Sequence, residues 1–401
     1  MSTDALVFNP FLPEFHANPY PFYARLRKED PVHQSPLGFW VLTRYDDVVT
    51  SLRDSRYGRD GFAPLIEAVY GPETAEGNLP RSMLMRDPPD HTRLRSLVNK
   101  AFTPRVIEGM RARIQMIVER LLDKVQDARS MDVIDDLAYP LPVTVICEML
   151  GVPLDDHEAI RGWSSDIARS LDAIGLLADP EIVARGVAAR RNLTDYFRRL
   201  LPERRKHPQA DLLSLLIAVE EQGDKLNEGE LLAMCLLLFI AGHETTVNLI
   251  GNGTLALLEH PDQMAKLRDD PVLIASAIEE LLRYDSPVQW TARITNSDVE
   301  IGDRTVPSGS MVIAVIGAAN RDPRHFQDPD RLDIVRADNR HVSFGFGIHF
   351  CLGAPLARVE GQIALGMLLR RMPDLALQAG ATTDRRKSSA LRGLQTLRAT
   401  F

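Results

Sequence analysis

The stretch Ser343-Phe344-Gly345-Phe346-Gly347-Ile348-His349-Phe350-Cys351-Leu352-Gly353-Ala354-Pro355 places one cysteine between a glycine-rich loop and an apolar segment. Its three glycines lack the Cβ atoms that would keep backbone N–H groups away from a sulfur, and they tolerate the positive φ angles of a tight loop. A thiolate at Cys351 could therefore accept several backbone hydrogen bonds.

The segment after Pro355 has the spacing of a helix, with apolar residues recurring up to Arg370 and Arg371. Cys351 is thus predicted at a helix N-terminus, where the partial positive charge favours a thiolate and lowers the thiol pKa, as a metal-binding sulfur requires. Two alternatives stay open. Cys351 could be a buried small hydrophobe, or it could bind zinc with His341 and His349, although no second pair of ligands completes a tetrahedral set.

The pattern Phe344-x-x-Gly347-x-His349-x-Cys351-x-Gly353 resembles the haem-binding signature of the cytochrome P450 monooxygenases, soluble bacterial type. The resemblance implies that Cys351 is the axial thiolate of haem b (iron protoporphyrin IX), and that the haem is also contacted by Phe344, Gly345, His349 and Gly353. A thiolate ligand favours cleavage of the O–O bond, so the resemblance implies activation of O2 as co-substrate.

Composition limits the classes of function. The formal charge is 47 − 55 = −8 with dispersed basic residues, which argues against nucleic acid as a partner. Three scattered cysteines fit a reducing compartment. The first residues lack a basic region followed by an apolar core, and the longest apolar run, residues 231–241, is too short to cross a bilayer. We expect a soluble, cytoplasmic protein with no membrane association.

The periodicity along the chain predicts a mainly α protein. A small sheet is expected from residues 31–33 and 38–42, beside helices at 19–28 and 46–52, and an irregular segment at 56–86. Longer helices are predicted at 104–127, 137–150, 155–171, 180–201, 211–221, 227–259 and 272–284. We find no linker or repeat and expect one domain over residues 1–401. The resemblance implies the triangular, helical cytochrome P450 fold with a small β-rich edge.

His91 and Arg95 lie four residues apart after the Pro88-Pro89 pair, so they share a helical face and could hold a pair of carboxylates. An ordinary solvated basic face is the alternative on this segment alone. The segment resembles the family helix whose His and Arg bind the haem propionates. Arg293 matches the position of a further propionate-binding arginine in the family.

The predicted helix at 227–259 is apolar all round in its first half, as a central buried helix should be. Ala241-Gly242-His243-Glu244-Thr245-Thr246 then inserts a charged pair and two hydroxyl groups, which is costly without a use. A metalloprotease helix would read His-Glu-x-x-His, but the last position is Val247. Thr245 could also simply hydrogen-bond to the carbonyl at position 241.

The same hexapeptide resembles the oxygen-binding motif of the family, in which the helix widens beside the haem and an acid followed by Thr delivers protons. The resemblance implies that Ala241 borders the haem, that Glu244 is the acid and that Thr245 is the alcohol. A carboxyl can relay protons from solvent while a buried hydroxyl donates hydrogen bonds.

Further positions follow from the resemblance. Glu280-x-x-Arg283, completed by Arg331, resembles the structural Glu-x-x-Arg element of the family, and we assign these three residues to scaffold stability. Val288 and Gln289 match positions that line the substrate pocket. The other candidate wall residues are apolar: Phe62, Leu65, Met83, Leu84, Leu237, Ile240 and Leu394.

Together these motifs predict a monooxygenase that hydroxylates or epoxidises an apolar small molecule such as a natural product, terpenoid, steroid or fatty acid. The chain ends 50 residues (401 − 351) after Cys351, which leaves no room for a fused reductase. Electrons from NAD(P)H should therefore arrive through a ferredoxin or flavodoxin, with basic residues such as Arg93, Lys100 or Arg358 as the docking site, and the protein should be a monomer. A peroxide-driven haem enzyme and a non-enzymatic haem ligand carrier or sensor are the alternatives.

Overall fold

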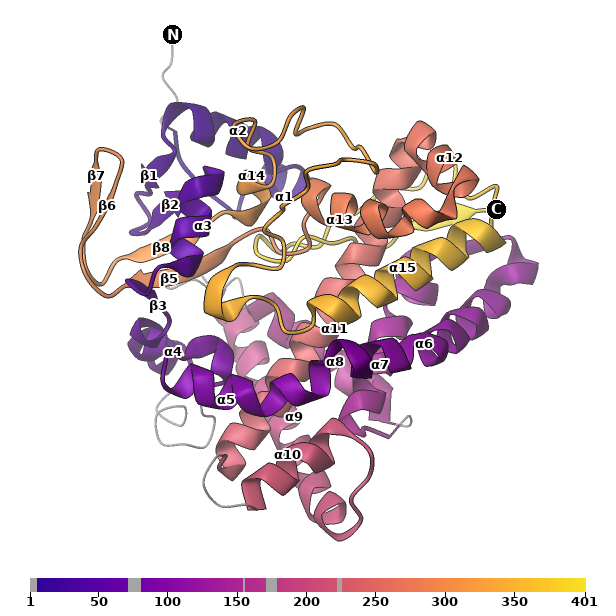
Figure 1. The fold of residues 1–401 in the computed structure, drawn as a ribbon, viewed down its shortest axis with the longest axis horizontal. Helices are drawn as coiled ribbons and strands as arrows, with labels where there is room; N and C mark the ends of the chain where they lie inside the picture. Colours follow the sequence, from indigo (N-terminus) through magenta and orange to yellow (C-terminus); the bar gives the residue numbers. More distant parts are fainter. Residues whose placement is uncertain (1–5, 71–80, 154–155, 171–178, 222–225) are drawn as a thin grey trace.

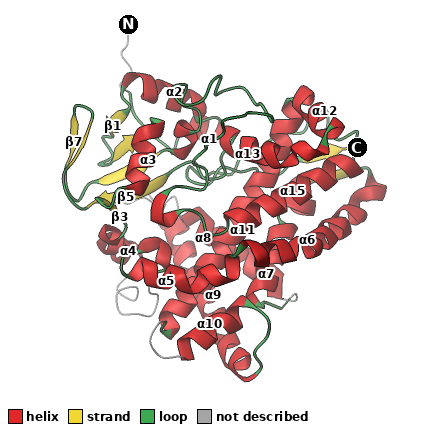
Figure 2. Ribbon diagram, in the orientation of Figure 1, coloured by secondary structure: helices red, strands yellow, loops and turns green. Residues whose placement is uncertain are grey.

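The structure, a computed structural model, describes residues 6–70, 81–153, 156–170, 179–221 and 226–401. Helices dominate these residues. Most strands gather at one edge of the molecule, and a smaller group lies near the C-terminus (Figure 2). This is the mainly α architecture with a small β edge that the sequence predicts.

Helix α11 (Glu228–Glu259) runs through the middle of the molecule and organises the rest (Figure 1). Its start is fixed by a capping box, because the Asn227 side chain accepts from the Glu230 N–H at 2.9 Å and the Glu230 carboxylate accepts from the Asn227 N–H at 3.1 Å. By length and composition α11 could cross a membrane, but 72% of its most apolar window is buried in the fold. It is a core helix.

The helices that pack around α11 carry their apolar residues toward one large core. Helices α6 and α15 lie side by side, α7 and α15 both contact α11, and α8 pairs with α9. The larger helices are α5 (Asp90–Val98), α6 (Pro104–Val125), α7 (Pro140–Leu150), α8 (His157–Ser170), α9 (Pro180–Lys206), α10 (Leu212–Glu221), α12 (Pro261–Asp269), α13 (Ile274–Tyr284) and α15 (Ala354–Arg371).

The main sheet has the order β1-β2-β8-β5-β3, in which β2 and β8 are parallel and the other neighbours antiparallel. Its strands are β1 (Val32–Gln34), β2 (Trp40–Leu42), β3 (Tyr57–Gly58), β5 (Thr291–Thr295) and β8 (Met311–Ala314). Side chains alternate between the two faces, so Trp40 and Leu42 enter one apolar cluster while Val41 enters another.

Shorter elements complete the fold. Short helices α1 (Pro13–Ala17), α2 (Tyr20–Glu29), α3 (Tyr45–Arg53) and α14 (Ile316–Ala319) flank the sheet. Two small sheets are formed by β6 (Val299–Ile301) with β7 (Arg304–Val306), and by β4 (Ser130–Asp132), β10 (Arg398–Thr400) and β9 (Ala376–Leu377). The first of these is the hairpin whose turn lies at Gly302.

The expectation that residues 56–86 are irregular is wrong in part. Residues Ala63–Tyr70 form helix α4, and Met83–Met85 form a 3-10 turn, while residues 71–80 lie outside the described chain. Pro64 misled the sequence argument because it occupies the first turn of α4, where its missing N–H is tolerated. Helix α7 also begins later than predicted, because residues Ile134–Ala138 form a π turn before it.

The Glu-x-x-Arg element forms a buried ion pair within α13, and this pair binds the segment before Cys351. Arg283 Nε and Nη2 each donate to the Glu280 carboxylate at 2.8 Å, and both side chains are inaccessible to solvent. The third cation is Arg336, whose Nε lies 3.1 Å from Glu280 Oε2. The prediction of Arg331 is therefore wrong. Its side chain is exposed, and it contributes only its carbonyl oxygen, which accepts from Arg283 at 3.1 Å.

Candidate active site

The loop that carries Cys351 is pinned between α3 and the start of α15. Gly345 and Gly347 have φ angles of +73° and +71°, which L side chains rarely adopt, and a Cβ on Gly347 would collide with the Leu52 carbonyl oxygen of α3. The Cys351 N–H donates to the Phe344 carbonyl at 2.8 Å. These constraints fix the cysteine immediately before the N-terminus of α15, as the sequence predicts.

Burial raises the pKa of the Cys351 thiol, and it outweighs the backbone N–H groups of Gly353 and Ala354 and the charges of Arg95 and Arg358, which act in the opposite direction. The expectation of a lowered pKa is therefore not met by the protein groups alone. Because a metal-bound sulfur must be deprotonated, the cation itself would have to displace the proton from this thiol.

Basic side chains converge beside this loop. The rings of His91 (α5) and His349 lie 4.3 Å apart between centroids. Arg95 Nη2 donates to the Phe350 carbonyl at 2.6 Å and so ties α5 to the cysteine loop. Burial, followed by the charges of Arg59, Arg293, His91 and Arg95, lowers the pKa of His349 to about 2. The structure thus brings together the three side chains that the sequence assigns to the propionates, His91, Arg95 and Arg293, and adds His349, which the sequence assigns to the haem.

Arg59 is the member of this cluster that the sequence analysis missed. Its Nη2 donates to Thr291 Oγ1 at 2.7 Å, and Arg293 Nη1 donates to the same oxygen at 3.2 Å. The nearby Asp87 carboxylate already accepts the backbone N–H groups of Arg59 and Asp60 at 2.9 Å. Arg59 lies where two short elements meet, so no periodicity could have marked it as buried.

The cluster fits a dianionic group. Among the described residues, both ring nitrogens of His91, Nε2 of His349 and Nε of Arg59 are buried without a hydrogen-bond partner. Buried donors and clustered positive charge are stable when an anion completes them. Two carboxylates, as in the propionates of haem b, would satisfy this set, with Cys351 next to it as the iron ligand.

The middle of α11 presents one stripe that the protein does not cover. Between Leu231 and Leu257 every residue is buried except Leu237, Ala241, Gly242 and Thr245. Three of these recur every fourth residue and therefore share one face. A planar cofactor packed against Ala241 would lie along this stripe.

Thr245 lies on the open stripe, but its hydroxyl donates to the Ala241 carbonyl at 3.1 Å, which is the alternative that the sequence left open. Helix α11 is also continuous through the hexapeptide, so the widening that the resemblance implies is not present. Thr245 must rotate away from Ala241 before its hydroxyl can donate elsewhere.

Glu244 is buried, and its carboxylate is held from two sides. Arg386 Nη1 lies 2.6 Å from Oε2, and His243 Nε2 lies 3.5 Å from Oε1. Burial raises the pKa of this carboxyl, but the hydrogen bond and charge of His243, together with Arg386, outweigh it and lower the pKa to about 2. Glu244 is therefore ionised at neutral pH.

The structure separates the predicted wall residues into groups. Phe62, Met83 and Ile240 are buried, Leu65, Leu237 and Val288 are half-buried, and Leu84 is 40% exposed. Leu394 is packed within the main core at 1% exposure. Gln289 is buried, and its amide donates to the Ser286 carbonyl at 2.8 Å and to the Tyr20 hydroxyl at 3.3 Å. Its place in a pocket wall stays a prediction.

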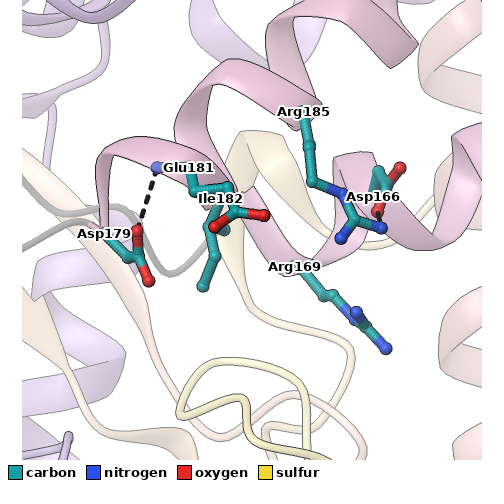
Figure 3. A pocket seen from close by; sticks show the side chains of 6 residues that line it. All are labelled: Asp166, Arg169, Asp179, Glu181, Ile182 and Arg185. Carbon is teal, nitrogen blue, oxygen red and sulfur yellow. Dashed lines mark hydrogen bonds and ion pairs between the residues drawn. The ribbon is translucent and has the colours of Figure 1, made fainter.

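A surface pocket of about 190 Å³ lies elsewhere, between α8 and α9 (Figure 3). Its lining is mostly charged, and the Arg185–Asp166 pair at 2.8 Å occupies one side. None of the predicted site residues borders it. The pocket therefore belongs to the helix pair and not to the cysteine site.

The fold and this site define a class, that of haem-thiolate proteins. The fold has a central helix with an acid–alcohol pair, and the site has a cysteine at a helix N-terminus beside a cluster of buried basic side chains. Comparison with known proteins agrees. The family model "Cytochrome P450" matches residues 56–373. The chain belongs to the cytochrome P450 family and is a cytochrome P450 monooxygenase of the soluble bacterial type.

Similar proteins cover nearly the whole chain. The polyketide biosynthesis cytochrome P450 PksS of Bacillus subtilis is 42% identical over 98% of both chains. Vitamin D(3) 25-hydroxylase of Pseudonocardia autotrophica is 45% identical over 96% of this chain and 94% of its own. Among solved structures, CalO2 superimposes with a TM-score of 0.92 at 36% identity, covering 99% of each chain. P450BioI, in complex with acyl carrier protein ligated to hexadec-9Z-enoic acid, has a TM-score of 0.88 at 41% identity and covers 97% and 99%.

Proposed function

We propose that this enzyme hydroxylates or epoxidises an apolar small molecule, and that it receives electrons from NAD(P)H through a separate ferredoxin or flavodoxin. The observation that carries the proposal is the position of Cys351. It lies on a loop held at the start of α15, beside buried basic side chains with ring and guanidinium nitrogens that lack a hydrogen-bond partner among the described residues. When haem is bound through a thiolate, it activates O2 and supplies the oxidant for this reaction.

Different residues of the chain would bind the haem and transfer protons. Cys351 would bind the iron, and Arg59, His91, Arg95, Arg293 and His349 would bind the propionates. Phe344, Gly345, Gly353 and Ala241 would border the ring. Glu244 would carry protons toward the open stripe of α11, and Thr245 would hold a proton there by hydrogen bonding once its contact with Ala241 is released.

The names of similar proteins support a range of substrate classes. They include a vitamin D(3) hydroxylase, a 6-deoxyerythronolide B hydroxylase and a structure that binds myristic acid. The half-buried Leu65, Leu237 and Val288 are apolar and suit such ligands. We therefore propose a polyketide, a sterol-like molecule or a fatty acid as the substrate.

The proposed docking site for the electron donor needs revision. Arg93 is paired with Glu230 at 2.5 Å, and Arg358 donates twice to Glu279, at 2.7 and 2.8 Å. Of the three basic residues proposed, Lys100 is exposed and forms no ion pair with the described residues, so we favour it. We further propose a cytoplasmic, monomeric enzyme that forms one domain.

The test is optical. The purified haem protein, reduced and treated with carbon monoxide, should give the spectrum of a thiolate-ligated haem, and Cys351→Ser should lose it. A spectrum of the imidazole-ligated, globin type would contradict the proposal. Titration with tetradecanoic acid, a macrolide aglycone and a sterol, followed by turnover with a surrogate ferredoxin and its reductase, then identifies the substrate class. Product with peroxide alone would instead support a peroxide-driven enzyme, and no product at all would support a carrier or sensor.

A further inference from the structure

The C-terminal residues 384–395 form a hairpin that lies against one face of α11. Gln395 donates to the Asp384 carbonyl at 2.8 Å, and the Arg386 N–H donates to the Gly393 carbonyl at 3.0 Å. A Cβ on Gly393 would overlap the Asn248 amide of α11. The hairpin is therefore seated directly on the helix, with no room for a side chain at that point.

Two adjacent arginines of this hairpin make different contacts. Arg385 donates to Asn252 Oδ1 at 2.8 Å and lies 3.2 Å from the Asp285 carboxylate. Arg386 instead reaches Glu244 Oε2 at 2.6 Å and donates from Nε to the Leu394 carbonyl at 3.2 Å. Arg385 thus anchors the hairpin, while Arg386 connects it to the acid of the hexapeptide.

Besides Arg386, His243 of the same helix lies beside Glu244, and Ser164 of α8 contacts His243 in turn. His243 is fully buried, with Nδ1 at 2.7 Å from the Phe239 carbonyl and Nε2 at 2.7 Å from Ser164 Oγ. The hydroxyl of Ser164 stays neutral at physiological pH. The Arg386 guanidinium has N–H donors and no acceptor, so it can orient a carboxylate by hydrogen bonding.

We propose that Arg386 is a positioning residue for Glu244, which makes the C-terminal hairpin part of the oxygen-activation site. The inference rests on the proposed role of Glu244 as the acid. Arg386 fixes the direction of the carboxylate and keeps it charged. The Arg386 side chain is 27% exposed, so it is the contact between the buried Glu244 carboxylate and solvent.

This arrangement has a chemical consequence. A carboxyl relays protons best when its pKa is close to the working pH. The pKa of Glu244 is instead lowered to about 2. Proton uptake by Glu244 should therefore require the contact with Arg386 to loosen. Replacing Arg386 should leave a buried carboxyl that binds a proton at higher pH.

The test follows the ionisation of Glu244 directly in the holoenzyme, by infrared difference spectroscopy of the protonated carboxyl C=O band between pH 4.5 and 8. The Glu244 band is identified by its absence in Glu244→Gln. It should be absent from the wild type over this whole range and should appear in Arg386→Gln with a midpoint inside the range, which requires the pKa of Glu244 to rise by about two units or more. Arg386→Met keeps the packing of the aliphatic stem and is the second variant, and Arg386→Lys should restore the wild-type result.

Arg385→Gln is the matched control, because it loosens the same hairpin without touching Glu244. The proposal is overturned if the band midpoint is unchanged in both the Gln and Met variants, or if Arg385→Gln moves it equally. A separate measurement, peroxide released per NAD(P)H with a surrogate ferredoxin, tests the role of Glu244 itself. No change in Glu244→Gln would count against the proposed function, whereas an unmoved band in the Arg386 variants would count against the positioning role.

Discussion

At the scale of single residues, two buried carboxyl groups differ in their charge. Glu244 is charged because a cation and a histidine face it, whereas Glu360 of α15 is fully buried and has no hydrogen-bond partner among the described residues. Burial alone raises the pKa of Glu360 well above its usual value. Environment, not residue type, decides which carboxyl carries charge.

The raised pKa of Glu360 makes stability depend on pH. A carboxyl whose pKa is raised in the folded state makes its full contribution to the free energy of unfolding below its unfolded pKa. That contribution is lost as pH rises. We therefore compare the free energy of unfolding of Glu360→Gln with that of the wild type at pH 4.5 and at pH 8. The difference in favour of the variant should be larger at pH 8, by about 1.4 kcal/mol for each unit of pKa shift. Thermal denaturation at the two pH values measures this. Equal differences at both would contradict the assignment of a neutral Glu360.

Thr245 provides a second prediction at this scale. Thr245→Ala should still bind haem and substrate, but it should divert reducing equivalents to peroxide and lower product per NAD(P)H on the order of tenfold or more, because proton transfer loses a positioned hydroxyl. Thr246→Ala is the matched control, since Thr246 is buried off the open stripe. Unchanged coupling in Thr245→Ala would refute the role.

At the scale of elements, α13 is locked to the segment before Cys351 by the Glu280 carboxylate. That carboxylate accepts from Arg283, from Arg336 and from the Asp333 N–H at 2.9 Å, all in a buried setting. A buried charge with several donors is stable only while they all remain. The element therefore holds the cysteine loop in register with α13.

The two candidate third cations can be compared directly. Arg336→Ala should lower the free energy of unfolding by about 2 kcal/mol, because a charged hydrogen bond to a buried carboxylate is lost. Arg331→Ala removes an exposed side chain and should change the free energy of unfolding by about 0.5 kcal/mol or less. Urea denaturation of both variants decides the matter, and the reverse order would restore Arg331 to the role that the sequence assigned.

At the scale of the whole molecule, Asp285 joins the two ends of the chain. It accepts from the Tyr20 hydroxyl and from Arg392 Nε, each at 2.7 Å, and Arg392 also donates to the His16 carbonyl at 2.9 Å. Burial raises the pKa of Asp285, but Arg392 and Arg385 outweigh it and lower the pKa to about 2. Helices α1 and α2 thus depend on residues near the C-terminus.

Breaking this connection should affect the whole fold. Arg392→Gln leaves Asp285 short of a partner and should cost about 3 kcal/mol, with earlier proteolysis near α1. Because the folded pKa of Asp285 is depressed, its stabilising contribution is present above the unfolded pKa of about 3.8 and is lost as pH falls toward 2. The loss in Arg392→Gln should therefore shrink in acid. Arg398→Gln, at an exposed position of β10, is the control.

The sequence by itself determined what depends on neighbours along the chain. Glycines at positive φ, the cysteine at a helix start, the His91–Arg95 spacing and the apolar period of α11 are local, and the described residues form them. Only the tertiary structure decided the long-range partners: Arg59 in the cation cluster, Arg336 on Glu280, Arg386 on Glu244, and the buried amide of Gln289. Spacing fixes which residues share a face of a helix. It does not fix which distant side chain meets that face, because that depends on how the elements pack.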